Sequence, residues 1–248
     1  MSAQSRTSAA DQPRKPSSAS PSASPPRTLS KAVSIPSQRP SNEHFDTVVT
    51  IEVGPEKKVF VVHKELLCFY SDYFRAPFDG SFKEAIEGKL TLPDENIDTF
   101  YLFDGFLYTN QLRNQERASG SNIRCYNLSR LWVFGDKYLV PALQNMAMDC
   151  LVERLHIVKK RLGSEPTMSF IYDNTVHDSP LRRMAIDWQV YGICVTDREQ
   201  LCSWPREAVV DLAMAQSTKE TMHYAGKQLP ESGKCHYHLH AEGEFCEV

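Results

Sequence analysis

The chain has 248 residues and a mass of 28.2 kDa, of which 41% are hydrophobic and 10% aromatic, enough to build a sizeable core. The mean hydropathy is -0.42, and no stretch reaches the apolar run of about 20 residues that a bilayer-spanning helix needs, so we expect no membrane partner. Lys and Arg total 28 against 31 Asp and Glu, a net charge of -3, so no global positive field favours nucleic acid as a partner.

Seven cysteines are spread along the chain, and an odd number favours free thiols over a disulfide framework. Free thiols are typical of a reducing compartment, so we expect a cytoplasmic or nuclear protein, or one found in both places. The N-terminus has no basic start followed by an apolar segment, so the sequence predicts no secretory signal.

Residues 1–42 differ in composition from the rest of the chain. They consist largely of Ser, Ala, Pro and basic residues, and the first aromatic residue is Phe45. Such a segment buries too little apolar surface to offset the entropy lost on ordering, so we predict a disordered tail. The segment has six basic residues and one acidic residue, Asp11, so it is positively charged. The basic residues are scattered, which favours a solvated tail over a nuclear-localisation signal.

Order is expected to begin near Phe45 with a β-hairpin. Residues 48–53 and 58–62 are rich in β-branched residues, and Gly54-Pro55 between them is a turn signal. After His63 the apolar spacing becomes helical, which predicts a short helix followed by a second one capped by Ser71. Residues 89–92 predict a third short strand.

Three longer helices are predicted next. Asp94 or Asn96 can cap a helix whose apolar and aromatic residues recur at three- and four-residue spacing. After a polar loop at 113–123, residues 128–139 predict another helix, and Pro141 is suited to the first turn of the one that follows.

The rest of the chain divides into two parts. Residues 158–222 contain three stretches of helical spacing, at 167–172, 180–193 and 205–215, and predict a helical extension. Residues 223–248 form a polar tail rich in Cys and His.

Four motifs in the correct order resemble those of BTB/POZ domains. The first is residues 60–74, with its His63-Lys64 pair and its Ser-x-Tyr-Phe ending at Phe74. The others are residues 88–93, 106–109 and 131–143. The resemblance implies an α+β BTB/POZ fold over residues 43–157, with a small three-stranded sheet flanked by helical hairpins. Residues 48–54 and 82–85 look most like fungal members of the family.

One position departs from the family pattern. Members often have Asp directly before the first strand, where it helps form a charged pocket with the basic residue after His63. Here that position is Thr47, with Asp46 one residue earlier, so the Asp46–Lys64 pairing is either shifted or absent. The pocket lies near the dimer interface in the family, so the resemblance leaves open whether this chain homodimerises.

The resemblance implies a protein–protein interaction module that is not an enzyme and has no small-molecule substrate. It further implies self-association and, as in many members, an adaptor role in which the domain binds a cullin scaffold of a ubiquitin ligase. We expect the partner surface at the end of the aromatic helix, at Phe103, Phe106 and Tyr108. An apolar aromatic face of this kind is typical of protein interfaces.

Two alternatives stay open. One is a transcription- or chromatin-associated regulator. The acidic charge of the folded part and the absence of a zinc-finger array from the sequence both argue against it. The other is a hydrolase that uses His63 or Cys68. The sequence contains neither a Gly-x-Ser-x-Gly elbow nor a Gly-rich phosphate loop, so no catalytic constellation supports it.

The C-terminal tail contains a candidate metal site. Cys235, His238, His240 and Cys246 offer two thiolates and two imidazoles, the mixture that suits tetrahedral zinc. Their spacing matches no standard zinc finger, and the alternative is a polar tail with chance His enrichment. A zinc ion with four protein ligands would be structural, because no coordination position stays open for chemistry.

Overall fold

The computed structural model describes residues 40–113, 120–158, 165–191, 198–221, 234–240 and 246, which all belong to one compact unit, Ala32–Val248. The predicted disordered tail at 1–42 therefore lies almost entirely outside the described residues. Among the described helices, none is both long and apolar enough to cross a membrane.

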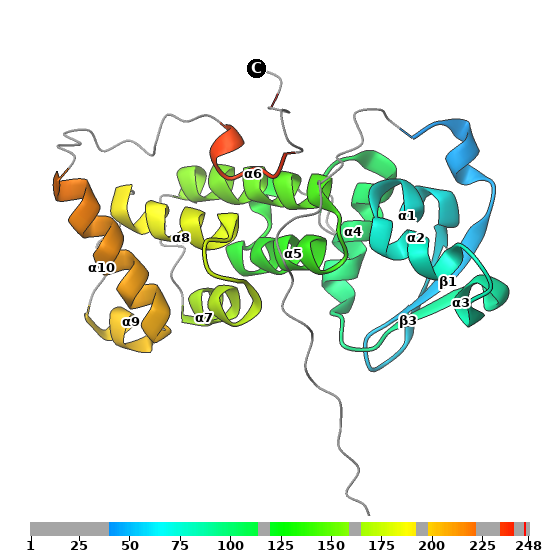
Figure 1. Ribbon diagram of the computed structural model, residues 1–248, viewed down its shortest axis with the longest axis horizontal. Helices are drawn as coiled ribbons and strands as arrows, with labels where there is room; N and C mark the ends of the chain where they lie inside the picture. The colour runs from blue at the N-terminus through cyan, green and yellow to red at the C-terminus, as the bar shows by residue number, and fades with distance from the viewer. Residues whose placement is uncertain are drawn as a thin grey trace, which may run out of the picture. The chain divides into compact units, whose positions relative to one another are not determined.

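A three-stranded sheet opens the fold (Figure 1). Strands β1 (Val48–Val53) and β2 (Lys58–His63) form the predicted antiparallel hairpin, and β3 (Lys89–Leu92) pairs with β1 in parallel, giving the order β2-β1-β3. Gly54 adopts a φ of 75° at the turn, a conformation that glycine takes without strain. Alternate residues of the strands are buried on one face, as period-2 patterning predicts.

Short helices cover part of this inner face. The predicted pair is present as α1 (Lys64–Tyr70) and α2 (Asp72–Phe78), and an additional helix, α3 (Lys83–Glu87), precedes β3. Ser71 is the N-cap of α2: its Oγ accepts a hydrogen bond from the Phe74 amide at 3.1 Å and donates one to the Tyr138 carbonyl at 2.6 Å. A single buried hydroxyl thus joins the first helical pair to the later helices.

Helix α4 (Ile97–Thr109) lies in the centre of the hydrophobic core. Asn96 caps it, since its side chain accepts a hydrogen bond from the Thr99 amide. Phe100 packs against Phe60 of the sheet with ring centroids 4.6 Å apart, and Phe103 packs against Phe134 at 5.0 Å. The helix therefore has neighbours on several sides.

Helices α5 (Cys125–Lys137) and α6 (Pro141–Val158) lie side by side and form the next layer (Figure 1). Helix α5 begins three residues before the predicted start and ends two before the predicted end. Gly135 allows the pair to approach closely, because a Cβ there would lie 2.7 Å from Gln144 Cγ and 3.1 Å from the Val140 carbonyl oxygen.

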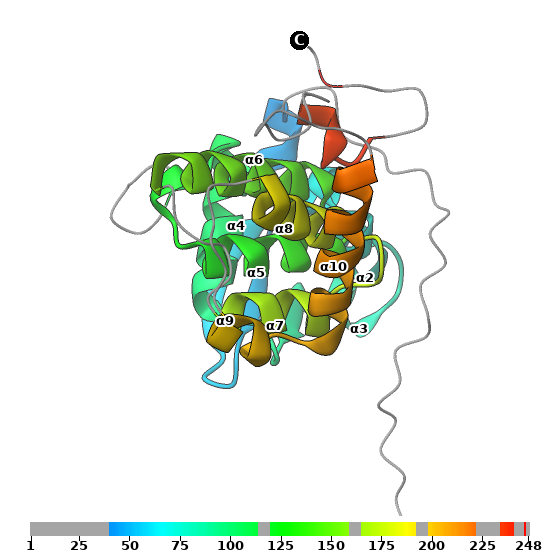
Figure 2. The ribbon, with the colours of Figure 1, turned by 90° about the vertical axis from the view of Figure 1, so that its left-hand side faces the viewer.

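The predicted helical extension is present in the described residues. It consists of α7 (Glu165–Asn174), α8 (Pro180–Tyr191), α9 (Arg198–Ser203) and α10 (Arg206–Thr221). Helix α7 packs on α5, and α10 packs on α7 and α8, as Figure 2 shows. Short 3-10 helices occur at Asn42–Phe45, Gly120–Asn122 and Lys234–His236.

A buried arginine holds the extension together. Arg182 donates hydrogen bonds to the carbonyls of Tyr172 and Thr175 at 2.7 and 2.6 Å, and its guanidinium lies 4.3 Å from the centroid of the Tyr172 ring. It also pairs with Glu207 of α10 at 2.9 Å. The Tyr172 hydroxyl donates to Asp211 on α10, and burial together with that carboxylate raises the pKa of Tyr172. Helices α7, α8 and α10 are thus joined by a polar network as well as by apolar packing.

Replacing Ser71 with Ala is expected to destabilise the protein by about 1–3 kcal/mol, because the Phe74 amide and the Tyr138 carbonyl both lose their partner in a buried site. Urea unfolding followed by circular dichroism measures this loss. Ser81→Ala, at an exposed position, is the matched control and should leave the midpoint unchanged. Equal midpoints for the two variants would contradict the role given to Ser71.

Candidate functional site

The predicted partner residues on α4 do not share one surface. Phe103 and Phe106 are both 0% exposed, so the prediction that they form a partner surface is wrong. Phe103 packs between Phe74 and Phe134, and Phe106 packs against Tyr70, with ring centroids 5.0–5.8 Å apart. Of the three predicted residues, Tyr108 alone is exposed, at 43%.

Tyr108 lies beside the end of strand β2. Its hydroxyl oxygen accepts a hydrogen bond from the His63 amide at 3.3 Å and lies 2.9 Å from His63 Nδ1. The ring of Phe45 packs edge-on against the His63 ring at 5.3 Å, so three aromatic side chains gather there. Partial burial raises the pKa of Tyr108, which keeps its hydroxyl neutral at physiological pH.

The outer face of the hairpin continues this exposed region. Val48 pairs with His63 across the strands, and Val61 and Val59 follow on the same face of β2. Five apolar side chains lie here, and each is 41–63% exposed: Phe45, Val48, Val59, Val61 and Tyr108. We call this set the outer patch. Within the described part of the chain, no helix covers them. A contiguous exposed apolar patch is typical of an interaction surface.

Strand β2 is also an edge strand. The Lys64 amide donates to the Thr47 carbonyl, toward β1, whereas the His63 amide donates to Tyr108, away from β1. Because amide direction alternates along a strand, the Val59 and Val61 amides also point away from β1. The outer patch thus lies along an edge whose backbone donors face outward, which is a template for pairing with another strand.

The charged pocket expected from the family is altered here. No ion pair joins Asp46 to Lys64, although the structure describes both residues. Instead, the Thr47 amide donates to Glu65 Oε2 at 3.2 Å. The Thr47 position therefore carries a backbone contact in place of the carboxylate.

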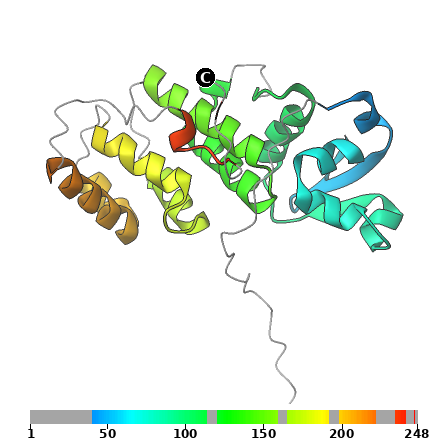
Figure 3. The same cartoon turned by 45° about the horizontal axis from the view of Figure 1, so that its top comes forward.

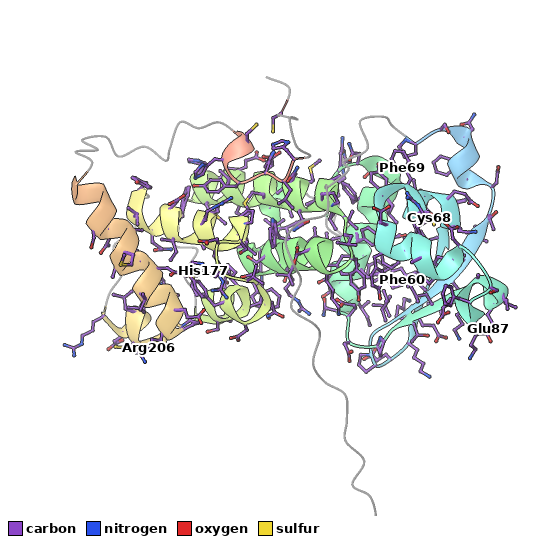
Figure 4. The ribbon with its side chains drawn as sticks, in the orientation of Figure 1. Phe60, Cys68, Phe69, Glu87, His177 and Arg206 are labelled. Atoms are coloured by element: carbon purple, nitrogen blue, oxygen red, sulfur yellow. The ribbon has the colours of Figure 1, made fainter. Side chains whose placement is uncertain are left out.

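The hydrolase alternative finds no support around Cys68. Burial raises the pKa of the Cys68 thiol to about 11, and the thiol lies on α1 with its hydrogen directed to the Phe74 carbonyl at 3.9 Å (Figure 4). A thiol with a raised pKa is a poor nucleophile at neutral pH. His63 is engaged with Tyr108, and its observed contacts are structural.

Three of the four predicted metal ligands come together near the C-terminus, and the fourth, His238, contacts one of them. The ligand atoms of Cys235, His240 and Cys246 all lie within 4.8 Å of one another. His238 Nδ1 lies 3.1 Å from Cys246 Sγ, and His240 Nε2 lies 3.5 Å from the same sulfur. Three of the predicted residues therefore form a close group, with His238 beside Cys246, and metal binding by them stays a prediction.

The segment that carries these residues lies on helices α6 and α8 (Figure 3). The Asn145 side chain binds the Leu239 backbone twice: its amide nitrogen donates to the Leu239 carbonyl, and its oxygen accepts from the Leu239 amide. Asp149, one turn later on α6, lies 2.9 Å from His238 Nε2. Sequence reasoning missed both α6 residues, since they lie 94 and 89 positions from their partners.

Tyr237 anchors the same segment on α8. It is buried, and its hydroxyl donates to Asp187 Oδ2 at 2.8 Å. Burial, with the nearby Asp187 carboxylate, raises the pKa of Tyr237. His236 Nε2 lies 3.4 Å from the same carboxylate oxygen, so Asp187 receives two side chains of the segment.

Comparison with known proteins identifies the first part of the fold. Residues 37–154 match the family model of the BTB/POZ domain, and no curated protein matches the chain. The α+β BTB fold predicted from the sequence is confirmed, and a protein–protein interaction module is the function that this domain implies. The likeness to fungal members stays a prediction.

Changing Tyr237 to Phe is expected to speed amide hydrogen exchange in residues 234–240 by about tenfold, because one hydrogen bond to a carboxylate is lost at a buried anchor. Exchange followed by mass spectrometry of the C-terminal peptide measures this. Tyr126→Phe, on α5, is the control. If the two variants exchange alike in this peptide, Tyr237 does not anchor the segment.

Proposed function

We propose, from the premise that residues 37–154 form a BTB/POZ domain, that the chain is a protein-binding adaptor that self-associates through the outer patch. The observation that carries the proposal is the coincidence of five exposed apolar side chains with an open edge strand. Burying such side chains is the main source of association free energy. Backbone hydrogen bonds between two edge strands would in addition fix how the partners align.

A second copy of the chain suits this surface. An antiparallel pairing of two β2 strands about a twofold axis at Val61 would place Val61 opposite its copy and Val59 opposite His63 of the copy. Residues 59–63 carry no Lys, Arg, Asp or Glu, and the next pair along brings Lys58 opposite Lys64 of the copy at the border of the interface. A self-complementary patch is what a twofold dimer requires.

The adaptor role adds a recruiting surface. In this proposal the BTB/POZ domain binds a cullin scaffold, as the family resemblance implies, and the helical extension recruits a substrate. Val210 and Met214, one turn apart on α10, are 51% and 65% exposed and offer an apolar stripe for that purpose. The cytosol and the nucleus are the compartments in which this role is expected.

Val61→Lys is expected to convert the wild-type dimer to a monomer. Placing an ammonium at the centre of an apolar interface costs about 2 kcal/mol or more, which weakens self-association by about 30-fold. Size-exclusion chromatography with light scattering on the full chain, over a range of concentrations, measures this change. Val210→Lys, at another exposed Val, on α10, should remain dimeric. A monomeric wild-type protein, or a dimeric Val61→Lys variant, would overturn the proposal.

Affinity purification of the full chain from source cells tests the adaptor role. We expect a cullin to be recovered with the wild-type chain, and no salt-dependent mobility shift with DNA. Recovery of corepressor or chromatin subunits without a cullin would support the transcription-associated role instead.

A further inference from the structure

We propose that Cys235, His238, His240 and Cys246 bind one structural zinc ion, which fixes the C-terminal segment on helices α6 and α8. The proposal is independent of self-association, because none of the five outer-patch residues belongs to this cluster.

The spacing of the donor atoms fits a tetrahedral ion. Zinc bonds of about 2.0 Å to nitrogen and about 2.3 Å to sulfur separate neighbouring ligand atoms by roughly 3.3–3.8 Å. The observed separations from Cys246 Sγ are 3.1 Å to His238 Nδ1 and 3.5 Å to His240 Nε2. Cys235 completes the set, with its sulfur within 4.8 Å of the donor atoms of His240 and Cys246. His238 contacts this group through Cys246, and in the proposal it moves toward Cys235 and His240 when the ion binds.

The chemistry of the donor set favours zinc over other common ions. Two thiolates and two imidazoles form a set that is typical of structural zinc, whereas magnesium and calcium prefer oxygen ligands. The Cys246 amide donates a hydrogen bond to Cys235 Sγ at 3.1 Å. Such a donor stabilises the thiolate form that metal binding requires.

Asp149 orients one of the ligands. Its Oδ1 lies 2.9 Å from His238 Nε2, so the tautomer with its proton on Nε2 would donate to the carboxylate and leave Nδ1, 3.1 Å from Cys246 Sγ, as the ligand atom. Metal-bound histidines commonly donate their second ring nitrogen to a carboxylate in this way. The His238 side chain is 6% exposed, whereas the Asp149 side chain is 42% exposed, so the histidine is the buried member of the pair.

A metal ion would add a further anchor to the segment. Among its described residues, 234–240 and 246, Tyr237 is the one buried hydrophobic side chain. One buried aromatic side chain gains little from apolar burial, so the segment is held largely by its polar contacts to Asn145, Asp149 and Asp187. A metal ion that joins Cys235 to Cys246 would close the intervening loop and add to this stabilisation.

A different chemistry shares part of this geometry. Cys246, His238 and Asp149 stand in the order of a thiol nucleophile, a base and an orienting carboxylate. That arrangement has no use for Cys235 or His240 beside the same sulfur, whereas zinc uses all four donors. Zinc binding is therefore the inference that accounts for the whole cluster.

Metal analysis of the purified full chain tests the proposal directly. The chain is produced without a histidine tag and its zinc content is measured by mass spectrometry of the elements. We expect about one zinc ion per chain. The double variant Cys235→Ser/Cys246→Ser should contain none, and Cys202→Ser, which removes an exposed thiol on α9, should retain it.

A variant with all four ligands intact separates metal binding from folding. Asp149→Asn should weaken zinc affinity by about 10- to 100-fold in competition with a chelator, as is usual for loss of a carboxylate behind a ligating histidine. Glu153→Gln, exposed one turn later on α6, is the matched control and should bind zinc like the wild type.

Three results would overturn the inference. They are a wild-type chain without zinc, zinc retained by the double cysteine variant, and equal zinc affinity in the Asp149 and Glu153 variants. A metal-free chain whose Cys246 is alkylated rapidly would point to the nucleophile arrangement, and one with a Cys235–Cys246 disulfide would point to a redox link.

Discussion

Helices cover one face of the three-stranded sheet and leave the other face open among the described residues. The inner face is fully closed: Ile51, Val53 and Val62 are inaccessible, and Phe60 packs on Phe100 of α4. Because α4 meets the sheet on one side and α5 on another, its three phenylalanines, Phe100, Phe103 and Phe106, are buried in the core. The proposed partner surface is therefore on the other side of the sheet, where Val48 of β1 and Val59 and Val61 of β2 are exposed.

Local patterns in the sequence were sufficient to predict most of the helices and strands. Period-2 alternation predicted the hairpin, side-chain oxygens predicted the caps at Ser71 and Asn96, and Pro141 predicted the start of α6, because each depends on neighbours within a few residues. Helix α3 was missed, since its five residues include none that is buried and so leave no apolar pattern.

The error at α4 has a specific physical cause. Helical spacing shows which residues share a face, but it does not show how many faces other elements cover. Three or four aromatic residues on one helix exceed what a single packing face can bury, so Phe103 and Phe106 were expected at the surface. Here the sheet, α1–α2 and α5 surround the helix, and both residues are buried. The outer patch depends in turn on Phe45 and Tyr108, which are distant in sequence and meet only in the folded chain.

The C-terminal cluster also combines residues that are close in sequence with residues that are far apart. Its four proposed donors lie within one short stretch, so residue type and spacing alone suggest them as a group. The residues that hold them in place, Asn145, Asp149 and Asp187, lie on α6 and α8 and left no signal next to the cluster. This cluster belongs to the side of the fold formed by α6 and α8, whereas the outer patch belongs to the sheet, so the two sites can be altered separately.

Residue-resolved hydrogen exchange at low and high protein concentration tests the central claim, that the open face and edge of β2 form the partner surface. We expect the Val59 and Val61 amides to exchange more slowly as the chain self-associates, while amides at the exposed side of α10 keep their rates. Self-association without added protection at Val59 and Val61 would contradict the account.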